Sequence, residues 1–159
     1  GGNPGGYVSA TDNVQGGTWY FKAPSAFHGD FSSAYATDLT FDLRQSSTSS
    51  QFDNTDVILR GGGLELTFDT ADNPGTDWTG YALELTETGG WVLNGSPPTQ
   101  AEFEQVLADV TDLQIRGEYR SGSDTGDLDN VVLLPEPFIA GVLALGGLGL
   151  LRRRRRGAA

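Results

Sequence analysis

The chain has 159 residues, of which 37% are hydrophobic and 23 are glycine, and it contains no cysteine or methionine. This length fits one domain plus a tail, and the lack of cysteine excludes disulfides, thiolate zinc sites and a cysteine nucleophile. Residues 1–134 carry five basic and 20 acidic side chains, a net charge of −15. This part of the chain, which we call the body, is so acidic that it repels nucleic acid, and we expect no nucleic-acid partner. It suits a soluble exported protein, or one that collects divalent cations.

The N-terminal segment, residues 1–17, reads GGNPGGYVSATDNVQGG and is rich in turn-forming residues around one short apolar stretch. We expect it to pack on the following domain or to lead into it. The chain does not begin with methionine, and the segment has neither the charged nor the apolar part of a signal peptide. We therefore interpret the sequence as a processed or truncated chain whose start, a signal peptide being one option, is missing.

Residues 18–134 contain a series of short apolar runs separated by clusters of Gly, Ser, Asn and Asp. Leu64, Leu66 and Phe68 alternate with polar residues, and this period of two is typical of half-buried strands. Many short strands at such spacing predict an all-β antiparallel sandwich. The predicted strands lie in residues 18–24, 39–45, 56–62, 64–70, 78–87, 111–120 and 128–134.

One segment, SPPTQAEFEQVLADV, has helical spacing instead. Thr99 followed by Glu102 is a capping box, in which each side chain binds the backbone amide of the other residue. We expect a single helix of about ten residues whose apolar stripe packs on the sandwich. The stripe consists of Phe103, Val106, Leu107 and Val110.

Several blocks of the body resemble the laminin IV (laminin B) domain in their order and spacing. They are WYFKAPSAFHGDFSSAYATDLTFDL, DVILRGGGLELTF, GYALELTETGGWVLNGSPPTQAEFEQVLADVTDLQIRGEY and LDNVVL, and together they span residues 18–133. The most specific block is residues 91–119. Two departures are residues 36–38, where the family often has glycines, and the lack of neighbouring cysteine-rich modules. The resemblance implies a jelly-roll β-sandwich, akin to carbohydrate-binding modules and the galactose-binding fold, that is extracellular, structural and not an enzyme.

The last part of the chain, residues 135–159, differs from the body. Pro135, Glu136 and Pro137 precede 14 uncharged residues, 138–151, which as a helix would span about 21 Å. That is short of the ~30 Å bilayer core. Arginines at one end favour a cytoplasmic location for that end, so the body would lie across the membrane. These arginines are Arg152, Arg153, Arg154, Arg155 and Arg156.

The order Pro-Glu-Pro, short hydrophobic helix, arginine cluster resembles the PEP-CTERM sorting signal, although Phe138 stands where small or hydroxylated residues often follow the tripeptide. The resemblance implies a bacterium that makes exopolysaccharide, and a partner membrane protease, an exosortase. Residues 138–151 would hold an inner-membrane-anchored precursor, which then moves to the cell surface or outside the cell. The alternative is an ordinary C-terminal anchor with a stop-transfer cluster.

Catalytic arrangements are weakly supported. His28 is the single histidine, and no serine stands in a strand–elbow motif, so we interpret His28 as a structural or exposed residue. Paired carboxylates could hydrolyse glycosides. With 20 acids in the body, however, pairs such as Glu84 with Glu87 arise by chance. No catalytic residue is predicted.

The chain requires no cofactor, and structural calcium is the better-supported of the chemical hypotheses. Hard cations prefer carboxylate and carbonyl oxygens from flexible turns, and SGSDTGDLDN offers such groups around Gly126. Sandwich modules of the kind that the resemblance implies often hold structural calcium where the first and last strands meet, which would bring Asp127 or Asp129 near Asp12 or Asn3. The alternative is a solvated acidic turn. The predicted ligands are Asp127, Asp129 and Asp12.

A sugar site would need an exposed aromatic ring beside polar groups. Trp19 and Trp91 lie in the laminin-like blocks and are expected in the core, whereas Trp78, in the loop GTDWTGY, is the predicted ligand-binding residue. The alternative for Trp78 is a core position, since tryptophan is mostly buried on average.

The sequence thus predicts an exported bacterial cell-surface or extracellular-matrix protein, not an enzyme, that serves as a structural or adhesive module and could contact exopolysaccharide. One alternative is an accessory binding domain of a larger secreted hydrolase truncated at its N-terminus. Another is a calcium-stabilised spacer without a ligand.

Overall fold

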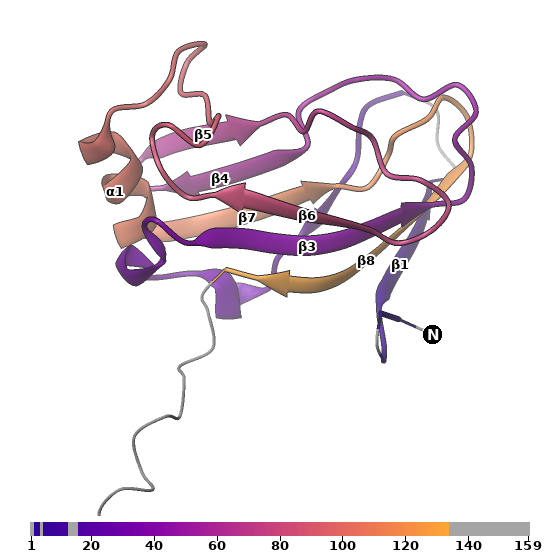
Figure 1. Cartoon of the computed structure of the whole chain (residues 1–159), viewed down its shortest axis with the longest axis horizontal. Helices are drawn as coiled ribbons and strands as arrows, with labels where there is room; N and C mark the ends of the chain where they lie inside the picture. Colours follow the sequence, from indigo (N-terminus) through magenta and orange to yellow (C-terminus); the bar gives the residue numbers. More distant parts are fainter. Residues whose placement is uncertain (1, 4, 13–15, 134–159) are drawn as a thin grey trace, which may run out of the picture.

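Two four-stranded antiparallel sheets face each other in the computed structural model, which describes residues 2–3, 5–12 and 16–133 (Figure 1). This confirms the predicted antiparallel sandwich. The first sheet has the order β1 (Val8–Asp12), β8 (Asp124–Val132), β3 (Asp38–Gln45) and β6 (Thr79–Glu84). The second has the order β2 (Tyr20–Lys22), β7 (Val110–Arg116), β4 (Val57–Gly61) and β5 (Leu64–Phe68).

Each predicted strand coincides with an observed one, but the edge strand β1 was missed and its neighbour β8 was predicted too short. Strand β1 was not predicted, because VSATD has a single large apolar residue and is mostly exposed. Its extended form comes from pairing with β8, from Val8 opposite Leu128 to Asp12 opposite Asp124. Strand β8 begins four residues before the predicted 128, within the segment SGSDTGDLDN that was predicted to be a turn with calcium ligands or, alternatively, a solvated acidic turn.

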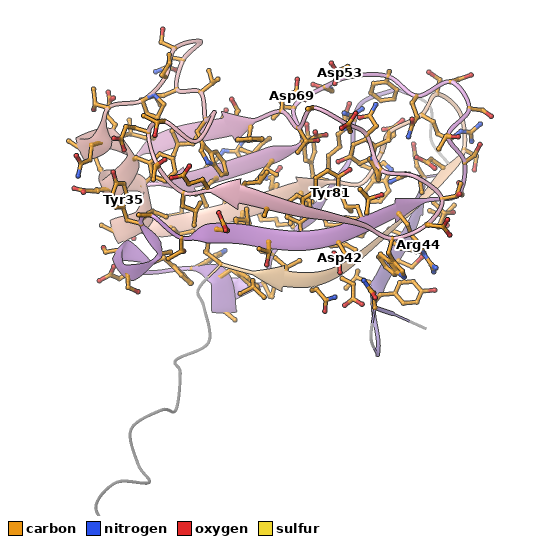
Figure 2. The ribbon with its side chains drawn as sticks, viewed as in Figure 1. Tyr35, Asp42, Arg44, Asp53, Asp69 and Tyr81 are labelled. Carbon is orange, nitrogen blue, oxygen red and sulfur yellow. The ribbon has the colours of Figure 1, made fainter. Side chains whose placement is uncertain are left out.

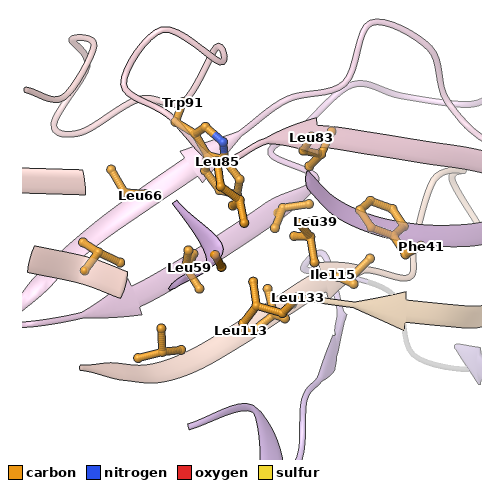
Figure 3. Packing of buried hydrophobic residues seen from close by; sticks show 14 of the residues in the cluster. Leu39, Phe41, Leu59, Leu66, Leu83, Leu85, Trp91, Leu113, Ile115 and Leu133 are labelled. Atoms are coloured by element: carbon orange, nitrogen blue, oxygen red, sulfur yellow. The ribbon is translucent and has the colours of Figure 1, made fainter. Parts of the chain in front are cut away.

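The core lies between the sheets and follows the alternation of the strands. In β3, Leu39, Phe41 and Leu43 are buried while the residues between them face outward. Figure 3 shows Leu39 facing Leu59 and Leu113 of the second sheet. Burying a large apolar side chain stabilises the fold by roughly 1.5–3 kcal/mol, so these inward faces account for most of the driving force.

The two tryptophans expected in the core differ in how deeply they are buried. Trp91 is 1% exposed, and its indole N–H donates to the Glu84 carbonyl at 2.8 Å. Trp19 is only half-buried; its ring meets Phe21 edge-on with centroids 4.9 Å apart and lies over Gly117.

The predicted helix is α1 (Gln100–Ala108), and its capping box is present. The Glu102 amide donates to Thr99 Oγ1 at 3.3 Å, and the Thr99 amide donates to the Glu102 carboxylate at 2.8 Å. Its buried residues are those of the predicted stripe up to Leu107, whereas Val110 already begins β7. The helix packs against β4 and β5, and two short 3-10 turns, η1 (Ser25–Phe27) and η2 (Ser32–Ala34), border the same end.

A buried arginine ties together the loop before β4 and the end of β7. Arg116 is fully buried, and its guanidinium pairs with Asp56 at 3.2 Å. It also donates to the carbonyls of Phe52, Asn54 and Glu118 at 2.7, 3.0 and 2.6 Å. These bonds satisfy a charge that would otherwise be costly to bury.

The expected tail, residues 135–159 with its apolar helix, sorting tripeptide and arginines, lies outside the described residues. Within the described part of the chain, the structure contains no helix of sufficient length and apolar character to cross a membrane.

Candidate functional site

The predicted ligand residues gather around the edge strand β1 and its partner β8. Asp127 and Asp129 belong to β8, and Asp129 Oδ2 accepts a 2.6 Å hydrogen bond from the Asn3 amide, as the prediction of neighbouring first and last segments implied. Asp12, however, pairs with Asp124, three register positions from the Ser9–Asp127 pair. At about 3.4 Å per residue, Asp12 lies about 10 Å along the strand from Asp127, so the structure does not bring the three acids together.

Trp78 and Asp127 both contact one arginine. Arg44, on β3, pairs with Asp127 Oδ2 at 2.7 Å. Its guanidinium lies 4.6 Å from the ring centre of Trp78 and 5.0 Å from that of Tyr7, and the two rings meet edge-on at 5.6 Å. Trp78 is half-buried. Its ring therefore serves at least partly to cover a cation, an arrangement worth about 0.5–1 kcal/mol at such sites, and only the remaining surface could contact a ligand.

Beside this cluster, two asparagines satisfy two aspartates. The side-chain amides of Asn3 and Asn130 donate to Asp42 Oδ2 at 3.1 and 2.7 Å. Asp129 accepts from the backbone amides of Asn3 and Asn130 at 2.6 and 2.9 Å. Figure 2 labels Asp42 and Arg44 on β3, in the part of the strand that pairs with β8. The contacts fasten the N-terminal segment to the sheet.

These partners bear on the predicted calcium site. Asp127 already neutralises Arg44, and Asp129 accepts two amide hydrogens. Within the described ranges, no group of three or more His, Asp or Glu side chains is placed to hold a metal ion. Calcium binding by Asp127, Asp129 and Asp12 stays a prediction.

The other candidates for chemistry have ordinary surroundings. His28 is exposed in the loop after η1. Glu87 accepts a 2.6 Å hydrogen bond from the Tyr35 hydroxyl, which lowers the pKa of Glu87 and raises the pKa of Tyr35 to about 12. Glu84 ends β6, and its backbone carbonyl accepts from Trp91. The lowered pKa of Glu87 is the opposite of what a proton donor near neutral pH needs.

Sequence reasoning missed an apolar cleft of about 550 Å³ at the edge where β1 and β2 lie. Its walls come from four separate segments, so no single motif could have indicated it. The apolar lining is mostly aromatic and branched, with Lys22, Asp129 and Asn130 at the polar positions. The apolar residues include Tyr7, Val8, Phe21, Phe27, Leu128 and Val131, with Leu113 and Ile115 of β7.

Comparison with known proteins defines the class to which this sandwich belongs. Its fold is that of the L4b domain of human laminin alpha-2, with a TM-score of 0.64 and 22% identity over 72% of this chain and 68% of that one. The family model for laminin B (domain IV) matches residues 20–134.

Curated relatives agree with this assignment. Human laminin subunit gamma-2 is 33% identical over 132 residues, and Danio rerio laminin subunit gamma-1 is 30% identical over 121 residues; the matches cover 79% and 72% of this chain. The basement membrane proteoglycan of Caenorhabditis elegans is 26% identical over 135 residues, 84% of this chain. The chain spans 11%, 7% and 4% of these relatives. The chain is a member of the laminin B (domain IV) family.

Proposed function

We propose that the chain is an exported module with a structural or adhesive role at the cell surface or in an extracellular matrix, and that it is not an enzyme. The observation that carries this is the laminin B (domain IV) match over residues 20–134, since the relatives are laminin subunits and a basement membrane proteoglycan. Membership of this family implies a structural extracellular role. The acidic surface of the body supports this role, because a large net charge keeps an exported domain soluble.

The tail supports a bacterial sorting route. Pro135, Glu136 and Pro137 would be read by an exosortase-type membrane protease, and residues 138–151 would hold the precursor in the inner membrane. The prolines favour an extended segment that a protease can bind as a strand. The arginines after residue 151 would keep the last residues in the cytoplasm.

We further propose that Trp78 contacts exopolysaccharide and that a bound calcium ion stabilises the fold. Trp78 has polar neighbours, which supports a sugar contact, but Arg44 occupies part of its ring. Calcium is checked by thermal unfolding with and without the ion, since a ligand that binds only the folded state raises Tm.

Export is tested by labelling intact bacterial cells with a membrane-impermeant amine reagent. Lys22 is the single lysine, and its side chain is 65% exposed. We expect labelling at Lys22 on intact cells, with a cytoplasmic lysine-rich protein as the negative control. Labelling only after lysis would overturn export.

Sorting is tested separately in the same cells. The double change Pro135→Ala and Pro137→Ala should leave labelled protein in the membrane fraction and reduce its release. Pro97→Ala, at an exposed position before α1, is the matched control and should be released as usual. Equal release of both variants would contradict the sorting proposal but leave export standing.

A further inference from the structure

The apolar cleft lies at the open side of the sandwich, between the edge strand of one sheet and the edge strand of the other. β1 is the edge of the first sheet and β2 the edge of the second. β2 has only three residues, and Leu113 and Ile115 of β7, which are buried at 0% and 2% exposure, form part of the lining. The cleft therefore reaches core residues of β7.

Two exposed apolar residues line the cleft. Among the described residues, the large hydrophobic side chains that are exposed are Tyr7, Val8 and Val132, at 40%, 59% and 38%. Tyr7 and Val8 line the cleft, whereas Val132 follows the lining residue Val131 on β8, so its side chain points to the other face of the sheet. Apolar exposure gathered at one place marks a surface that something covers.

The chain itself supplies a matching segment. Leu128 and Val131 of β8 line the cleft, and the described chain ends two residues later, at Leu133. Residues 138–151 contain no charge and begin five residues beyond Leu133, a distance of at most about 17 Å of extended chain. The run is thus tethered within reach of the cleft.

We propose that part of the apolar run in residues 138–151 occupies this cleft whenever the tail is outside a membrane. The cleft volume is that of a site for a drug-sized ligand, so a few side chains fill it. The five arginines that follow are attracted by a body of net charge −15. A second copy of the chain would meet the same negative charge, and it lacks the high effective concentration that the tether gives the tail. The sandwich then shields its own apolar tail from water.

Cysteine pairs test this in the full chain, because the protein has no cysteine of its own. One variant carries Val8→Cys and Ile139→Cys. The matched control carries Ala82→Cys and Ile139→Cys; Ala82 is exposed on β6, the opposite edge of the same sheet. Dilute purified protein is oxidised with oxidised glutathione, without lipid or protease, and intramolecular disulfide formation is followed by intact mass.

We expect the Val8 pair to close at least about fivefold faster than the Ala82 pair, as docking raises the local concentration of the tail. A ratio of the two closure rates below about fivefold would overturn the proposal. Adding Leu143→Asp to the Val8 pair leaves the sandwich unchanged and should remove the preference; a preference that persists would show tethering without docking and would also overturn it. Thermal unfolding verifies that all variants fold. Neither export nor sorting enters this experiment, so its failure is separate from theirs.

Discussion

Arg116 is the residue on which the polar part of the interior depends. It is fully buried, and its partner Asp56 is 1% exposed. Asp56 also accepts a hydrogen bond from the Thr70 amide at 2.9 Å. We predict that Arg116→Met lowers the free energy of unfolding by about 3–5 kcal/mol, because it leaves a buried carboxylate without its counter-charge. Urea unfolding measures the change.

The control for Arg116→Met is Arg120→Met. Arg120 is only partly buried, and its guanidinium donates to the backbone carbonyls of Ser49 and Ser123. Its loss should cost well under half as much, since solvent can replace the donors. Equal losses for the two variants would contradict the role given to the buried pair.

Glu118 makes stability depend on pH. Burial, together with the charges of Asp12 and Asp124, raises the pKa of Glu118. An acid with a raised pKa binds its proton more tightly in the folded than in the unfolded chain, so its contribution to stability falls as the pH rises from the ordinary carboxyl range through the raised pKa. We predict that Glu118→Gln is more stable than the parent at pH 7, and that the difference vanishes at about pH 3.5, where the glutamate is protonated in both states.

Urea midpoints at the two pH values check this prediction. Glu104→Gln, at an exposed position of α1, should change little at either pH. A Glu118→Gln variant that is less stable than the parent at pH 7 would show that its charge stabilises the fold.

At the scale of elements, helix α1 depends on its first residues. Thr99→Ala removes both hydrogen bonds that involve the threonine hydroxyl, and we predict a loss of about 1 kcal/mol. Thermal unfolding measures it, with Thr48→Ala on an exposed loop as the control. The helix is short and buries Phe103, so a negligible loss would mean that packing alone fixes its start.

An element could be predicted from the sequence when the residues that determine its conformation are close together in the chain. The capping box and stripe of α1 are local, and the sequence predicts them. In β3, the alternation of Leu39, Phe41 and Leu43 is local as well. Strand β1 was missed because its extended form depends on β8, more than 100 residues away in the chain.

The contacts of the candidate site residues could not be predicted from the sequence for the same reason. The acidic residues next to Asp127 in the sequence predict a calcium ligand. In the structure its carboxylate accepts a hydrogen bond from Arg44, 83 residues away in the chain. The loop around Trp78 predicts an exposed ring, but Tyr7 and Arg44 contact that ring in the structure. Long-range pairings decide what these side chains bind, and a single sequence does not display them.

At the scale of the whole molecule, two parts with opposite properties share one chain. The sandwich is acidic and belongs to the laminin B (domain IV) family. The tail is apolar and then basic. The cleft beside β8 has an apolar lining and lies close to the point where the tail begins. It is therefore suited to bind the apolar part of the tail.

The most direct test of an exported and sorted module is the intact mass of the protein recovered from cells and from the medium. We predict that the released form lacks the residues after Pro137, while the membrane form keeps them. Recovery of all the protein in the membrane, with Arg152 to Arg156 intact, would contradict the sorting proposal and identify the tail as a plain anchor.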